Sequence, residues 1–242
     1  MMPESTLIGM SLTSYSDFLS KNPKLPDTDA NTQLVKKVGV NIQNAVIKFM
    51  STNKKYKKRI EGYKWEFNLV NDKTVNAWCM PGGKVVVYSG LLPVTQTEAG
   101  LAVVMGHEIA HAIARHGNER MSQGMLVQLG GIGIAVALSQ KPAETQDIFL
   151  QSYGIGSSLG MLGYSRKHES EADKLGLVFM AMAGYNPEEA VGFWERMSKA
   201  GGGGGPQLLS THPSDETRIK SIKAFLPKAM KYYTKPLGTS GK

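Results

Sequence analysis

Apolar residues recur three to four positions apart along much of this 242-residue chain, the spacing of an amphipathic helix. The pattern is clearest between Asn31 and Met50, where a helix is predicted. Further helices are expected over about residues 166–183, from Asn186 onward, and from about Ser214. Residues 1–29, by contrast, are polar and are expected to be irregular.

Three short segments are rich in aromatic and β-branched residues and are predicted to be strands: Tyr63–Val70, Val75–Met80 and Lys84–Tyr88. The turn-forming residues Asn71-Asp72 and Pro81–Gly83 separate them. A small antiparallel or mixed sheet is therefore expected.

Thr95 and Glu98 match a capping box, in which a threonine begins a helix and a glutamate three residues later caps it in return. The helix is expected to run to about Arg115. A glycine-interrupted helical region follows over 119–164, and Gly201–Gly205 has the composition of a flexible loop.

These elements predict an α+β fold that is mainly helical. We expect an N-terminal extension over residues 1–29, a single domain over 30–228 and a C-terminal tail over 229–242. No repeat of 20–50 residues is present, which excludes a solenoid.

The net charge of +8 is concentrated in Lys54–Arg59, but no nucleic-acid-binding motif accompanies this run. A solvated helix end or loop is the favoured interpretation, and nucleic acid is not expected as a partner. The longest apolar stretch, Met125–Leu138, is short and broken by glycines, so it favours a core segment or a lid over a membrane anchor.

The single cysteine, Cys79, excludes an internal disulfide and a cysteine-based zinc cluster. The first residues show neither a basic region nor a long apolar region of an export signal. Two readings follow: the protein is cytoplasmic, or an export signal has been removed.

His107, Glu108 and His111 form an H-E-x-x-H pattern inside the apolar helix predicted over 95–115. Residues four apart lie on one face of a helix, so both imidazoles can reach a single ion. The glutamate between them can take a proton from a metal-bound water. The pattern predicts a zinc site that hydrolyses peptide bonds.

The third ligand is not a histidine of the same helix, because Ile113 and Gly117 occupy the glycine and histidine positions of the metzincin pattern. On a continuous helix, His116 would lie about 180° from His107. It is therefore expected to have a structural or capping role.

Glu169 and Asp173 share one side of the next helix, since they are also four residues apart. Glu169 is the candidate third ligand, and Asp173 is expected to accept a hydrogen bond from a ligand histidine. His168 is a weaker candidate ligand, and Glu171 is expected at the surface.

Together these residues resemble the gluzincin metallopeptidases that include HtpX, the CAAX prenyl proteases, mitochondrial Oma-type proteases and the bacterial periplasmic BepA- and LoiP-type proteases. Three further segments, Asn76–Gly83, Tyr164–Arg166 and Ser210–Pro213 followed by Arg218, resemble motifs of that family. The likeness covers about residues 30–225.

The resemblance implies a zincin-like fold with its sheet beside the metal helix, one Zn²⁺ per chain, and an endopeptidase that acts on misfolded or envelope proteins in quality control. The alternative is a latent or non-hydrolytic, zinc-stabilised chaperone that binds unfolded chains. The closest likeness is to the periplasmic lipoprotein branch, which implies a periplasmic or outer-membrane location and a peripheral membrane association.

The resemblance also implies roles for residues outside the two helices. Asn76 and Ala77 would lie on an edge strand that pairs with extended substrate. His212 and Arg218 would approach the zinc from the C-terminal segment. There they would stabilise the oxyanion of the reaction, or His212 would cap the zinc in a latent form.

Overall fold

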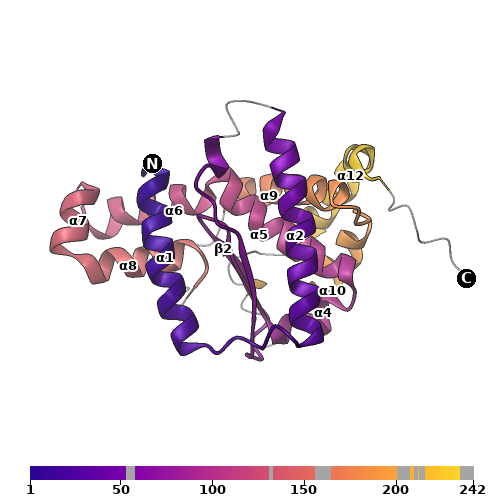
Figure 1. Ribbon diagram of the computed structural model, residues 1–242. Coiled ribbons are helices and arrows are strands. Elements are labelled where there is room, and N and C mark those ends of the chain that lie inside the picture. The colour runs from indigo at the N-terminus through magenta and orange to yellow at the C-terminus, as the bar shows by residue number, and fades with distance from the viewer. Residues whose placement is uncertain are drawn as a thin grey trace, which may run out of the picture.

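The computed structural model describes residues 1–52, 58–130, 133–155, 165–200, 208–209, 212 and 216–234. Helices account for most of this part of the chain (Figure 1): α1 (Glu4–Lys21), α2 (Ala30–Ser51), α4 (Leu92–Thr95), α5 (Glu98–Ala114), α6 (His116–Gln128), α7 (Ile134–Gln140), α8 (Pro142–Ser152), α9 (Arg166–Met182), α10 (Glu189–Ala200) and α12 (Glu216–Ala229). Short 3₁₀ turns occupy Lys58–Ile60, Ser89–Leu91 and Met230–Tyr232. The expected loop Gly201–Gly205 and most of the basic run at 54–59 lie outside the described residues.

The three predicted strands form one mixed sheet. Strands β1 (Glu66–Val70), β2 (Ala77–Met80) and β3 (Lys84–Tyr88) are arranged in the order β1-β3-β2. Strand β3 runs parallel to β1 and antiparallel to β2. The mainly helical α+β class with a small three-stranded sheet is thus confirmed.

The sheet separates two hydrophobic cores. Side chains of β3 alternate between them, because successive residues of a strand point to opposite faces. Val85 and Val87 face a core built with α2, α5 and α9, whereas Val86 and Tyr88 face a core built with α1, α6 and α8. Both faces are buried, and α5 lies against β2.

The N-terminal segment is helical, so the prediction of an irregular structure there was wrong. Helix α1 packs against the second face of the sheet, with Leu7 buried and the Phe18 ring edge-on to Trp78 at 5.0 Å between centroids. Burial of these side chains against the sheet stabilises the helix. The local sequence pattern did not indicate this burial. The division of the chain at residues 29 and 228 stays a prediction.

The capping box at Thr95 was placed two residues too early. Thr97 is the N-cap of α5, and its hydroxyl accepts a hydrogen bond from Gly100 N at 2.9 Å. Thr95 instead ends α4, and Glu98 binds Lys37 at 2.8 Å. Helix α10 similarly begins at Glu189, later than predicted.

Helices α6, α7 and α8 form an arm on the side of the molecule opposite α12 (Figure 1). Met125–Leu138 was expected to be a core segment or a lid. Met125 and Ala137 are buried, but Leu126 and Val127 are 66% and 80% exposed. Among the described residues, no helix combines the length and the hydropathy needed to cross a bilayer.

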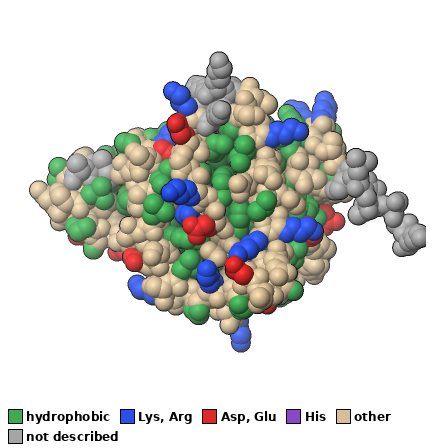
Figure 2. Space-filling view, viewed as in Figure 1, with side chains coloured by type: hydrophobic (Ala, Val, Ile, Leu, Met, Phe, Trp, Pro, Cys, Tyr) green, Lys and Arg blue, Asp and Glu red, His purple; other side chains and the backbone are tan. Residues whose placement is uncertain are grey.

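The chemistry-bearing residues lie inside the protein. All five histidines belong to the described residues and are buried, and none reaches the face drawn in Figure 2. A site assembled from them is therefore built between elements of the fold.

Candidate metal centre

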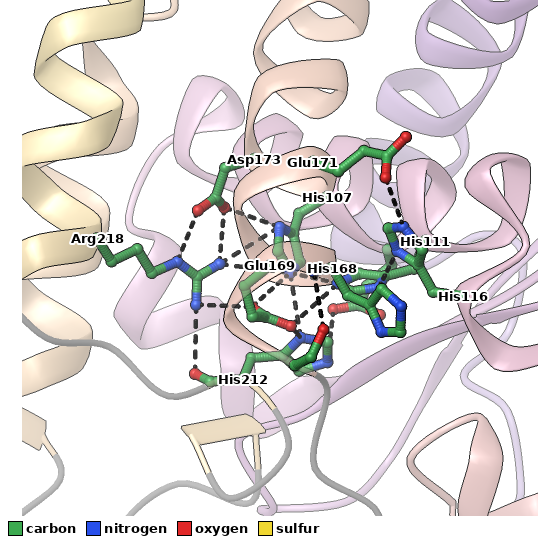
Figure 3. A network of polar contacts seen from close by, with 11 residues as sticks. His107, His111, His116, His168, Glu169, Glu171, Asp173, His212 and Arg218 are labelled. Atoms are coloured by element: carbon green, nitrogen blue, oxygen red, sulfur yellow. Dashed lines mark hydrogen bonds and ion pairs between the residues drawn. The ribbon is translucent and has the colours of Figure 1, made fainter. Parts of the chain in front are cut away.

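Helices α5 and α9 lie side by side and bring together the three predicted ligands (Figure 3). His107 and His111 point from α5, and Glu169 points toward them from α9. The Nε2 atoms of the two histidines are 3.0 Å apart, and they lie 3.4 and 3.3 Å from the Glu169 carboxylate oxygens.

These distances fit a single bound ion. Zinc binds imidazole nitrogen and carboxylate oxygen at about 2.0–2.2 Å, so two donors of a tetrahedral site lie roughly 3.3 Å apart. Imidazole nitrogens and a carboxylate are also the donor types that zinc takes in catalytic sites. The arrangement therefore fits a metal ion bound by His107, His111 and Glu169.

The charges around this point also fit a divalent cation. Glu108, Glu169 and Asp173 are buried within the same small region, and the buried guanidinium of Arg218 forms ion pairs with Glu169 and Asp173. Three carboxylates and one guanidinium leave a formal charge of −2, which is costly away from water. A divalent ion would balance that charge.

His212 fills the remaining side of the donor set (Figure 3). Its Nδ1 lies 2.9 Å from Glu169 Oε1 and 3.1 Å from His107 Nε2. The four donor atoms of His107, His111, Glu169 and His212 all lie within 4.8 Å of one another. His212 thus stands where the fourth ligand of a tetrahedral ion would be.

Glu108 lies beside this fourth position, with Oε1 3.5 Å from His212 Nε2. Its side chain is buried, and burial raises the pKa of the Glu108 carboxyl. The opposite holds for Glu169: burial works against its charge, but the neighbouring His212 and hydrogen bonds from His107 and His111 hold the pKa of Glu169 well below its usual range. One carboxylate is suited to taking a proton, and the other to binding a cation.

Asp173 lies where the sequence places it, one turn after Glu169. Its Oδ1 is 2.9 Å from His107 Nδ1, so it can accept a hydrogen bond from the ring nitrogen that faces away from the other donors. Such a bond fixes the tautomer and the orientation of a ligand histidine.

Arg218 points toward the donor set and is held by the acidic residues Asp173 and Glu169 (Figure 3). Its Nε and Nη2 donate to the two oxygens of Asp173 at 2.8 and 2.7 Å, and Nη1 is 3.0 Å from Glu169. The guanidinium also stacks over the Trp194 ring at 3.5 Å. Sequence reasoning missed Trp194, since no motif includes it.

His116 and His168 are not among the donors that converge on this point. His116 instead lies behind His111, with the two Nδ1 atoms 2.9 Å apart, and burial lowers its pKa to about 4. His168 stacks on His116 at 4.4 Å between centroids and contacts Glu119. Glu171 is half-exposed, as predicted, but also contacts His116.

Asn76 and Ala77 lie at the start of β2, an edge of the described sheet. The Asn76 side chain is buried and accepts a hydrogen bond from Ala77 N at 2.9 Å. Because α5 lies against β2, this edge is close to the helix that carries His107 and His111. Of the other family-like motifs, residues 164, 210, 211 and 213 lie outside the described part of the chain.

Comparisons with known proteins agree with this geometry. The family model described as Peptidase family M48 matches residues 41–226. The mitochondrial metalloendopeptidase OMA1 of Schizosaccharomyces pombe is 41% identical over 69% of this chain and 48% of its own length. OMA1 of Saccharomyces cerevisiae is 36% identical over 72% of this chain and 50% of its own length. The beta-barrel assembly-enhancing protease of Escherichia coli is 29% identical over 66% of this chain and 34% of its own length.

The expectation of a periplasmic or outer-membrane location was wrong. The relatives at 36–41% identity are mitochondrial metalloendopeptidases, whereas the beta-barrel assembly-enhancing protease is less similar, at 29%. The chain spans about half the length, or less, of the curated relatives it matches.

Proposed function

The chain belongs to peptidase family M48, and from that premise we propose that its metal centre holds one Zn²⁺ and hydrolyses peptide bonds within polypeptide chains. The observation that carries the proposal is the convergence of His107, His111 and Glu169 on one point, with the buried Glu108 beside it. Two imidazoles and a carboxylate are a zinc peptidase donor set, and a buried glutamate next to it is a general base.

His107, His111 and Glu169 would hold the zinc, which when bound would lower the pKa of a water molecule and polarise the scissile carbonyl. Glu108 takes the proton of that water and returns it to the leaving amine. Asp173 keeps His107 in the tautomer that presents Nε2, and Arg218 holds Asp173 ionised through its two hydrogen bonds. These residues account for the acidic and basic groups buried around the donor set.

We further propose that the conformation described here is a latent one. A catalytic zinc site keeps one position open for water and substrate, whereas a site with four protein ligands is closed. His212 occupies the fourth position at 2.9 Å from Glu169 and lies beside Glu108. Hydrolysis would therefore require His212 to move away from the donor set.

The substrates proposed are unfolded or misfolded polypeptides, which can add an extended segment to the edge of β2 near Asn76 and Ala77. Mitochondria are the proposed location, in view of the OMA1 relatives. A purely non-hydrolytic chaperone has no support in the site, because a binding scaffold does not need the buried base Glu108.

The test is cleavage of unfolded casein by the wild type, with and without a zinc chelator, and by Glu108→Gln. Wild-type cleavage should require zinc, and Glu108→Gln should keep its zinc while losing roughly 10²–10⁴-fold in rate. Glu195→Gln is the matched control, since Glu195 is half-exposed and forms its ion pair with Lys223 instead of with a residue of the donor set. Chelator-resistant cleavage, or a Glu108→Gln variant as fast as the wild type, would refute the proposal.

A further inference from the structure

A second row of polar residues lies behind His111 and leads from the metal centre to the surface (Figure 3). The Nδ1 atom of His116 is 2.9 Å from Nδ1 of His111, and Nε2 of His116 is 3.2 Å from the Glu171 carboxylate. His116 is buried, whereas Glu171 is 54% exposed. The two outer residues thus connect a candidate ligand to solvent through one imidazole.

The break between α5 and α6 creates this contact. On a continuous helix, His116 would lie about 140° around the axis from His111, out of reach. Arg115 ends α5 in the left-handed conformation, with φ 66°, and α6 starts at the next residue. The Arg115 side chain holds this turn through Glu4 at 2.9 Å and the Met2 carbonyl at 3.1 Å.

The positions of the protons follow from the contacts. Nε2 of His111 faces the other donors at 3.0–3.3 Å, so it must be unprotonated to bind a cation, and the neutral ring carries its proton on Nδ1. Nδ1 of His116 must then be unprotonated and accept a hydrogen bond from this N–H, which leaves the His116 proton on Nε2. That group faces Glu171 and donates to it. Every nitrogen in the row then has a matching partner.

The orientation of His116 has its own support. Its ring stacks on His168 at 4.4 Å between centroids with 19° between the planes, and His168 Nε2 lies 3.2 Å from Glu119. The stacking holds the His116 ring edge toward His111. His107 differs, since it reaches a carboxylate directly, with Nδ1 2.9 Å from Asp173.

We propose that His116 and Glu171 are positioning residues for the metal centre: through the row His111–His116–Glu171 they fix the tautomer of His111 that presents Nε2 to the ion. The two ligand histidines of α5 are thus oriented by different devices, His107 by a carboxylate in direct contact and His111 by a carboxylate acting through an imidazole. The proposal rests on the proposed zinc site, because it assigns the ion to the side of His111 Nε2.

The first test is the zinc dissociation constant, measured by competition with a chromophoric chelator. His116→Ala should weaken zinc binding about 10–100-fold, the usual effect of losing a hydrogen-bond partner of a ligand. His116→Asn should restore most of the affinity, since its amide oxygen can replace Nδ1 as the acceptor. The zinc affinity of Glu171→Gln should fall between those of His116→Ala and the wild type.

Glu195→Gln is the matched control, because Glu195 is a half-exposed glutamate whose ion pair is with Lys223 and which lies outside the row. Its zinc affinity should equal that of the wild type. Wild-type affinity in both His116→Ala and Glu171→Gln, or equal losses in Glu171→Gln and Glu195→Gln, would overturn the proposal. A wild-type protein that binds no zinc would instead refute the proposed function.

The second test observes the protons themselves. In long-range ¹H–¹⁵N spectra of the zinc-loaded, histidine-labelled protein, His111 should appear as the Nδ1–H tautomer and His116 as the Nε2–H tautomer. An Nδ1–H signal from His116 would overturn the assignment, since His116 could not then accept from His111. If His116→Ala fails to fold, the proposal is tested by this spectrum of the wild type and by the zinc affinity of Glu171→Gln, whose substituted side chain is half-exposed.

Discussion

Gly176 of α9 lies directly against the backbone of His107 in α5. A Cβ atom at Gly176 would be 2.9 Å from His107 N and 3.1 Å from the Gly106 carbonyl oxygen, closer than side chains normally approach a backbone. The absence of a side chain at this position lets the two ligand-bearing helices approach closely. Glu169, two turns earlier in α9, reaches the histidines of α5 because of this contact.

Gly176→Ala is therefore expected to push α9 away from α5. Overpacking of this kind costs about 1–3 kcal/mol of unfolding free energy, and the displacement of Glu169 should weaken zinc binding at the same time. Denaturant unfolding and chelator competition measure the two effects. Gly9→Ala in α1 is the control, because no atom lies within 4 Å of its Cβ, so neither quantity should fall. Unchanged zinc affinity in Gly176→Ala would contradict the role given to the helix contact.

Removal of a ligand should be distinguishable from removal of the base. His107→Ala deletes one of the converging donors, so elemental analysis should find far less than one zinc per chain. Glu108→Gln, the next residue, keeps all four donors and should retain full zinc content. A stoichiometric zinc content in His107→Ala would remove this histidine from the ligand set.

The Asp173–Arg218 pair should contribute to stability in a pH-dependent manner. Burial by itself would raise the pKa of the Asp173 carboxyl, but the charge of Arg218 and the hydrogen bonds that His107 and Arg218 donate to the carboxylate hold that pKa below its ordinary value. Asp173→Asn leaves a buried guanidinium without its main partner and should cost about 3–5 kcal/mol at pH 7.

The sign of the pH effect follows from linkage. A carboxylate whose pKa is lower in the folded state stabilises the protein above the unfolded-state pKa of about 3.9, and this stabilisation is lost as the pH falls through the folded-state value. Urea unfolding of the metal-free proteins should show the largest difference between wild type and Asp173→Asn at pH 7 and a shrinking difference below about pH 4. Glu195→Gln, which removes the exposed partner of Lys223, should cost less than about 1 kcal/mol. A pH-independent difference for Asp173→Asn would contradict the assigned cause.

His212→Ala should separate a latent cap from an oxyanion-stabilising residue. If His212 occupies the fourth ligand position, its removal opens the site, and cleavage of an unfolded substrate should increase on the order of tenfold, or about 1.4 kcal/mol. If His212 instead stabilises the oxyanion, the rate should fall by a factor of roughly 10²–10³. Steady-state rates on casein, with zinc content measured in parallel, choose between these outcomes.

Contacts between residues four apart in one helix could be predicted from the sequence. Contacts that form because the chain changes direction between two helices could not. The pairs His107–His111 and Glu169–Asp173 are each four residues apart in one helix, so their shared faces follow from helix geometry alone. His116 lies outside the group of converging donor atoms, and its contact with His111 depends on the left-handed Arg115, a conformation that arginine seldom adopts and that no local pattern indicated.

The sequence by itself determined the shared face of His107 and His111 on α5, the three strands and the mainly helical class, because these depend on periodicity and on chemistry within short segments. Only the tertiary structure decided that α1 is a helix packed on the sheet, that Arg218 donates to Asp173 and lies over the Trp194 ring, and that His212 lies beside Glu169 and the H-E-x-x-H histidines. Each of these depends on burial between segments far apart in the chain. The free energy of such burial comes from non-local contacts that a local pattern does not encode.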